Sequence, residues 1–145
     1  MRKYAVAVLA GAVSCFSMPL LQARAEMMAM KADLKGASEV PPTKSPAAGM
    51  MTAAYDTASK KLTWKGTISG LSGDATAAHF HGPAAAGKNA GVLVPVTGVK
   101  TGAFEGSATL TDDQAKAFEA GQVYFNIHTA ANPDGEVRGQ VMKGQ

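Results

Sequence analysis

The three histidines of the chain carry the strongest chemical signal in the sequence. His79 and His81 stand one residue apart in AHFHGPA (78–84), and His128 stands in FNIHT (125–129). Side chains at positions i and i+2 of a strand lie on one face, about 6–7 Å apart at the backbone, so two imidazoles can lean onto one ion. A third imidazole from a neighbouring strand would complete a set of three nitrogen ligands with an open position. Imidazole suits copper, zinc, iron or nickel.

Period-two alternation indicates where these histidines point. His79 and His81 alternate with apolar residues, so they occupy the face opposite to the core. In QVYFNIHT (122–129) the face opposite to the apolar residues carries Tyr124, Asn126 and His128. If the two segments are neighbouring strands, the histidines converge on one patch, walled by the loops that follow each strand, and Asn126 shares that patch as a candidate supporting residue. The alternative is that the histidines face solvent and bind nothing.

The first 25 residues predict a cleaved secretory signal peptide. Arg2 and Lys3 precede an apolar run that begins at Ala5, and residues 23–25 (ARA) have the small-x-small pattern of a cleavage site. The apolar run is too short for a membrane span. A rival interpretation makes Cys15 a lipid-anchor cysteine, but the chain stays apolar after it. We therefore expect a periplasmic or secreted protein that has no membrane attachment after cleavage.

Composition limits the partners of the remaining chain. The whole sequence has 14 Lys and Arg against 11 Asp and Glu. Removing Arg2, Lys3 and Arg24 from the 14 leaves 11 basic residues, so the remainder has no net charge with neutral histidines. This balance gives no reason to expect nucleic acid or an anionic membrane as a partner. Cys15 is the only cysteine, which excludes disulfides and thiolate ligands after cleavage.

Methionines are the other soft ligands in the sequence. Met27, Met28 and Met30 form a cluster, and Met50 and Met51 follow later. Thioethers select Cu(I). We favour the alternative that these residues are apolar filler beside a frayed terminus.

The rest of the pattern predicts an all-β domain with one short helix. We interpret residues 26–30 as a short leader and 31–145 as a single domain. Alternating segments bounded by Gly, Pro, Asn and Asp predict strands at 31–36, 50–56, 61–69, 75–82, 92–96, 103–110, 122–129 and 135–143. Pro95 indicates an edge strand. A capping box of Thr111 with Gln114 predicts a helix over 111–121. About eight such strands favour a Greek-key β-sandwich or barrel.

Four motifs resemble one known family. The chain contains, in this order, SEVPP (38–42), AHFHGPA (78–84), YFNIHT (124–129) and NPDGEVRGQ (132–140). Together they are similar to the CHRD domain, a module named after chordin and found in many secreted bacterial proteins, over about residues 31 to 142. Phe80 and Val137 depart from the residues usual in the family. The resemblance implies an immunoglobulin-like Greek-key barrel similar to that of copper/zinc superoxide dismutase.

The similarity to the dismutase barrel also implies a metal site. In those enzymes an H-x-H strand and a later strand histidine hold copper outside the barrel, which corresponds here to His79, His81 and His128. The similar C-terminal segment would bring Arg138 near the metal. Glu39 would then orient a ligand imidazole or pair with Arg138, and we favour a structural role for it. The fourth copper histidine, the zinc histidines and the disulfide of those enzymes have no counterpart, so a dismutase-type zinc site is not expected.

Three functions remain open from the sequence. The favoured one is an exported protein that binds one transition-metal ion, with copper favoured, in metal buffering or tolerance. The second is a metal-free extracytoplasmic module that binds a protein or glycan. The third is a copper-only dismutase-like enzyme, which ranks lower because of the missing ligands. No GxSxG elbow, P-loop or thiol nucleophile indicates another catalytic class, and the sequence identifies no protein partner.

Overall fold

The computed structural model describes residues 25–144, so the predicted signal peptide lies outside the described residues except for Ala25. The described chain consists of antiparallel strands, one α-helix and a 3-10 turn. Their bounds are β1 (Met27–Lys35), η1 (Gly36–Ser38), β2 (Ala48–Asp56), β3 (Lys61–Ser69), β4 (Ala75–His81), β5 (Val92–Val96), β6 (Gly102–Thr109), α1 (Asp112–Glu119), β7 (Tyr124–Thr129), β8 (Val137–Gln140) and β9 (Met142–Lys143). Within residues 25–144, no helix is long and apolar enough to cross a membrane.

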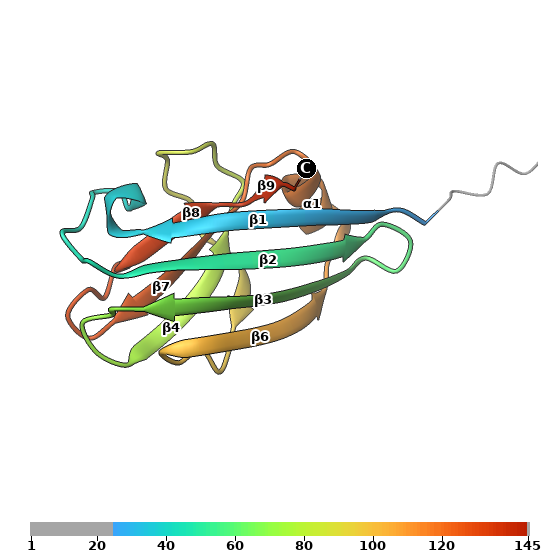
Figure 1. Ribbon diagram of the computed structural model, residues 1–145. Coiled ribbons are helices and arrows are strands. Elements are labelled where there is room, and N and C mark those ends of the chain that lie inside the picture. Colours follow the sequence, from blue (N-terminus) through green and yellow to red (C-terminus); the bar gives the residue numbers. More distant parts are fainter. Residues whose placement is uncertain (1–24, 145) are drawn as a thin grey trace, which may run out of the picture.

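The strands form one curled sheet in the order β5-β4-β7-β8-β1-β2-β3-β6, with the short β9 paired to β1. Figure 1 shows β1, β2, β3 and β6 in one layer, with β4, β7 and β8 behind them and α1 at one end. The sheet curls into a nearly closed antiparallel barrel, so the predicted all-β barrel or sandwich with one short helix is confirmed. β5 lies at one end of the strand order, as Pro95 predicts.

Alternating apolar residues build the core between the layers. Phe80 is fully buried, and its ring centroid lies 5.2 Å from that of Trp64, 5.3 Å from Phe118 and 5.0 Å from Phe125. These aromatic contacts fix the inward face of β4. Because successive strand side chains point to opposite faces, the residues on either side of Phe80, which are His79 and His81, must point out of the core.

The predicted helix is confirmed, with its capping box. The Thr111 hydroxyl accepts a hydrogen bond from the Gln114 backbone N–H at 3.3 Å, and the Gln114 side chain accepts one from the Thr111 N–H at 2.9 Å. Phe118 faces the core from this helix. The helix therefore covers one end of the barrel and contributes to the packing around Phe80.

The two ends of the domain differ from the sequence prediction. Met27 to Met30, predicted as a leader, form the first half of β1 and pair with β2. The weak β-propensity of methionine and alanine hides this strand in the sequence. The last predicted strand divides at Val141, which is buried and whose N–H donates to the Val123 carbonyl at 2.8 Å.

Candidate metal centre

Two neighbouring strands carry the three histidines. β4 and β7 pair antiparallel, with Ala77 opposite His128, His79 opposite Asn126 and His81 opposite Tyr124. The condition set by the sequence, that the two histidine strands be neighbours, is therefore met. All three imidazoles lie on the face of the sheet away from the core.

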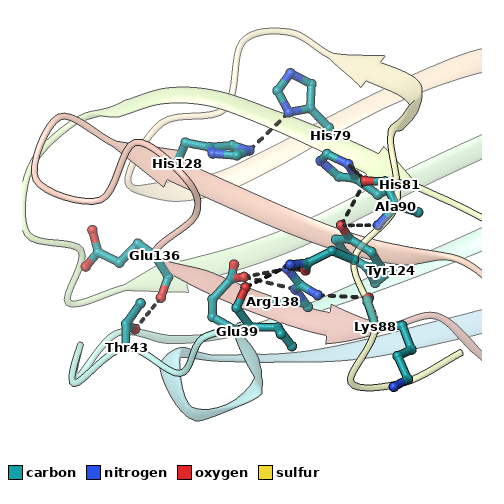
Figure 2. Close-up of polar contacts among 12 residues, drawn as sticks. Glu39, Thr43, His79, His81, Lys88, Ala90, Tyr124, His128, Glu136 and Arg138 are labelled. Carbon is teal, nitrogen blue, oxygen red and sulfur yellow. Dashed lines mark hydrogen bonds and ion pairs between the residues drawn. The ribbon is translucent and has the colours of Figure 1, made fainter. Parts of the chain in front are cut away.

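The ring nitrogens lie at distances suited to one ion. One ligand nitrogen from each histidine lies within 4.8 Å of the others. His79 Nδ1 and His128 Nε2 are 3.1 Å apart, and Figure 2 shows both rings beside His81. Two nitrogens that each lie about 2.0–2.1 Å from one zinc ion at a tetrahedral angle are themselves about 3.3 Å apart. Small ring rotations would therefore bring all three nitrogens onto one ion.

Backbone carbonyls fix the tautomers of two imidazoles. His81 Nδ1 lies 3.0 Å from the Ala90 carbonyl oxygen, and His128 Nδ1 lies 2.9 Å from the Pro133 carbonyl oxygen. A carbonyl oxygen only accepts, so each Nδ1 carries the proton and each Nε2 keeps its lone pair. His81 Nε2 is buried and has no hydrogen-bond partner. Carbonyls that hold the outer ring nitrogen orient metal-binding histidines in the same way.

The loops that supply these carbonyls also cover the site. His81 and His128 are each 9 % exposed, whereas His79 is half-buried, so the solvent-facing alternative is wrong for two of the three histidines. Burial lowers the pKa of His79, and the neighbouring histidines lower it further. Burial also lowers the pKa of His81, against the opposing effect of its bond to Ala90. A lowered pKa keeps imidazole neutral, which is the form that binds metal.

Tyr124 supports His81 in two ways. The two rings are stacked, with centroids 4.8 Å apart and planes 3° apart. The Tyr124 hydroxyl donates to the same Ala90 carbonyl at 3.2 Å. Alternation placed Tyr124 on the histidine face, but the sequence analysis assigned it no role, because only the folded loop brings Ala90 to it.

Arg138 and Glu39 form a buried ion pair behind this stack. Arg138 Nε and Nη2 each lie 2.9 Å from Glu39 Oε2, and the two residues are 5 % and 3 % exposed. Burial raises the pKa of Glu39, while the Arg138 charge opposes that rise. Pairing with Arg138 is one of the two roles considered for Glu39 from the sequence.

The Arg138 guanidinium also holds the covering loop. Its Cζ lies 3.9 Å from the Tyr124 ring centroid. Nη1 donates to the Lys88 carbonyl at 3.2 Å (Figure 2). Nη2 donates to Asn89 Oδ1 at 2.8 Å. Arg138 therefore ties the loop of residues 82–91, which carries Ala90, to the sheet.

Comparison of the sequence with models of protein families shows to which family the chain belongs. The model of the CHRD domain matches residues 30–141. The chain belongs to the CHRD domain family. No curated protein and no solved structure matches it. In this CHRD domain, Glu39 of SEVPP, the histidines of AHFHGPA and YFNIHT, and Arg138 of NPDGEVRGQ meet around one face of the barrel.

A second buried polar cluster of the CHRD domain has Glu136 at its centre. Its fully buried carboxylate accepts hydrogen bonds from the hydroxyls of Ser45, Ser72 and Thr129, each at 2.6 Å, and from the Ser72 N–H at 2.9 Å. Burial by itself would raise the pKa of Glu136, but these hydrogen bonds outweigh it and lower the pKa to about 2. Sequence reasoning missed this residue because its partners lie on segments far apart in the chain.

The methionines that the sequence analysis named, all within the described residues, do not join the histidines. Met30 and Met51 are buried in the core, whereas Met27 and Met50 are 64 % and 51 % exposed. Met27 pairs opposite Asp56 within β1 and β2 rather than fraying from the domain. The interpretation as apolar filler therefore holds for Met30 and Met51, and that of a frayed terminus is wrong.

Proposed function

We propose that this CHRD domain binds one transition-metal ion, with copper favoured, through His79 Nδ1, His81 Nε2 and His128 Nε2. The observation that carries this proposal is the pair of carbonyls that leave Nε2 of His81 and of His128 unprotonated, with His128 Nε2 already 3.1 Å from His79 Nδ1. A buried acceptor without a partner costs about 1–3 kcal/mol, and a metal ion would remove that cost for His81.

The donor types favour copper as the ion. Imidazole nitrogens suit several divalent metals, and copper binds most tightly among them in the Irving–Williams order. The role that follows is metal buffering or tolerance. Arg138 gives no support to the dismutase-like alternative, because its guanidinium already bonds Glu39, Lys88 and Asn89.

The place of action belongs to the same proposal. We propose that residues 1–25 act as a signal peptide and that the protein works in the periplasm or outside the cell, where a thiol-free histidine site withstands oxidation. Intact mass of the exported protein should give a chain that starts at Glu26. A lipid-modified chain that starts at Cys15 would contradict this.

Metal titration tests the site directly. The purified protein is titrated with Cu(II) and with Zn(II), and bound metal is measured by elemental analysis after desalting. We expect one equivalent in the wild type and none in His81→Ala. Met50→Ala is the control, because this exposed thioether lies outside the site and its loss should change nothing.

A different result would favour the metal-free alternative. If the wild type retains no metal, the histidine face is an interaction surface. A partner that needs Glu39 or Arg138 but no metal would then establish a protein- or glycan-binding module.

A further inference from the structure

Asn126 lies at the centre of the histidine face. It stands on β7 two residues before His128 and directly opposite His79 on β4. Facing residues of paired antiparallel strands have Cβ atoms about 4.5–5.5 Å apart, so the Asn126 side chain rises between the histidines. Its exposed fraction is 2 %, which makes it the most deeply buried polar side chain on this face.

Two unpartnered acceptors meet at this position. Asn126 Oδ1 and His81 Nε2 are both buried, and neither has a hydrogen-bond partner. Asn126 faces His79 across the strand pair, and His81 stands two residues further along β4 on the same face. Because the proton of the His81 ring is on Nδ1, where it donates to the Ala90 carbonyl, Nε2 carries a lone pair. Asn126 Oδ1 carries lone pairs as well, so neither atom can donate a hydrogen bond to the other. A cation between them satisfies both atoms at once.

The position of Glu39 accounts for the orientation of the Asn126 side-chain amide. A Cβ atom built on Gly135 would lie 2.9 Å from Asn126 Nδ2 and 2.5 Å from Glu39 Oε1, so both atoms border the same glycine. Arg138 holds the Glu39 carboxylate through Oε2, which leaves Oε1 as a buried acceptor without a partner. Turning the amide would point its oxygen at the carboxylate, so Glu39 favours the orientation with Nδ2 towards itself and Oδ1 towards His81.

We infer that Asn126 Oδ1 is a fourth protein ligand of the metal site, and that Glu39 sets its orientation. This inference rests on the proposed metal-binding function. It replaces a site of three nitrogens with one of three nitrogens and one oxygen. An amide oxygen is a harder donor than imidazole, whereas Cu(I) prefers thiolates and thioethers. The completed set therefore selects a divalent ion, Cu(II) or Zn(II), over Cu(I).

Replacing the amide while keeping its size tests the inference. The wild type, Asn126→Leu and Asn126→Asp are compared for Zn(II) affinity by competition with a coloured chelator. They are also compared for the visible absorption spectrum of bound Co(II), which reports the number and type of ligands. Thr63→Leu is the control, because Thr63 is an exposed polar residue on β3, which does not pair with either histidine strand.

We expect Asn126→Leu to bind Zn(II) at least about tenfold more weakly and to change the Co(II) spectrum. Asn126→Asp should change the Zn(II) affinity, because one carboxylate oxygen adds charge beside the ion while the other takes the place of Nδ2 next to Glu39 Oε1. Thr63→Leu should match the wild type in both measurements. Cu(II) should bind more tightly than Cu(I) in the wild type, and that preference should shrink in Asn126→Leu.

The results separate this inference from the proposed function. If His81→Ala abolishes binding while Asn126→Leu keeps wild-type affinity and spectrum, the inference is overturned and the proposed function stands. If the wild type binds no metal, both fail. If Asn126→Leu does not fold, Asn126→Asp decides, and unchanged Zn(II) affinity in that variant overturns the inference.

Discussion

At the scale of single residues, one proton on His81 governs the proposed site. That proton stands on Nδ1, which donates a hydrogen bond to the Ala90 carbonyl, and the Tyr124 hydroxyl donates to the same carbonyl. The position of Ala90 therefore decides which ring nitrogen faces the other histidines. Arg138 holds the loop that carries Ala90, so a residue outside the site controls the chemistry within it.

Removing Arg138 should damage both stability and metal binding. Arg138→Met leaves the Glu39 carboxylate buried without its cation, which should cost about 3–5 kcal/mol of unfolding free energy. The freed loop should also weaken Zn(II) binding. Chemical denaturation and metal titration measure the two effects. The double variant Glu39→Gln with Arg138→Met should recover part of the stability, and an unchanged stability of the single variant would contradict a structural ion pair.

Gly135 leaves no room for a side chain. Its φ of 130° lies in the region that favours glycine, and an added Cβ would lie 2.5 Å from Glu39 Oε1. Gly135→Ala should therefore lose more than the roughly 1–3 kcal/mol that backbone strain alone costs. Gly87→Ala is the matched control, because Gly87 also has positive φ (76°) but nothing lies within 4 Å of its added Cβ. Equal losses in chemical denaturation would show that the contacts at Gly135 do not matter.

At the scale of elements, Glu136 ties two loops to the end of β7. The Ser45 and Ser72 hydroxyls belong to loops before β2 and after β3, and Thr129 ends β7. Glu136 stands just before β8, and its carboxylate turns away from Glu39 and Arg138 in Figure 2. This cluster therefore fixes the end of the barrel near the histidines without belonging to their site.

Acid should remove the contribution of Glu136. Its pKa falls from the ordinary 4.5 to about 2 on folding, so its stabilisation is complete above about pH 4.5 and is lost as the pH falls towards 2. A shift of this size corresponds to about 3 kcal/mol. We expect Glu136→Gln to be less stable than the wild type at pH 7, with the difference closing near pH 2.

Chemical denaturation across this pH range measures the effect of Glu136. Glu119→Gln, which changes an exposed carboxylate on α1, is the control and should lose little. A stability difference that persists unchanged at pH 2 would show that the charge of Glu136 does not stabilise the fold.

Strand alternation made β4 and β7 predictable, together with the direction of their histidines. Phe80 and Phe125 are strongly apolar and are therefore expected to face the core. Alternation then places the residues next to them on the opposite face of the sheet. The start of β1 was not predictable, because Met27 to Met30 look like a flexible leader until β2 pairs with them. Ala90 and Pro133 were not predictable as partners, since backbone carbonyls carry no side-chain signal. The shared face of the three histidines thus follows from the sequence, whereas their tautomers depend on loop conformation.

At the scale of the whole molecule, the histidine site joins parts of the chain that are otherwise separate. It connects β4, β7 and the two loops that supply Ala90 and Pro133. An ion that binds this arrangement would bind the folded state more tightly than the unfolded one, because the unfolded chain does not hold the three imidazoles together. Metal binding and folding are therefore linked, and thermal stability reports the site without any assay of activity.

Metal should raise the melting temperature of the wild type and leave that of His128→Ala unchanged. A ligand at 100 times its dissociation constant adds about 2.7 kcal/mol, which for a domain of this size is roughly 10 °C. Hydrogen exchange should slow most in residues 82–91 and 130–136, because these loops hold the ligand imidazoles. Glu119→Gln should respond to metal as the wild type does. An equal rise in His128→Ala would place the bound metal elsewhere on the molecule, since that variant lacks the ligand on β7.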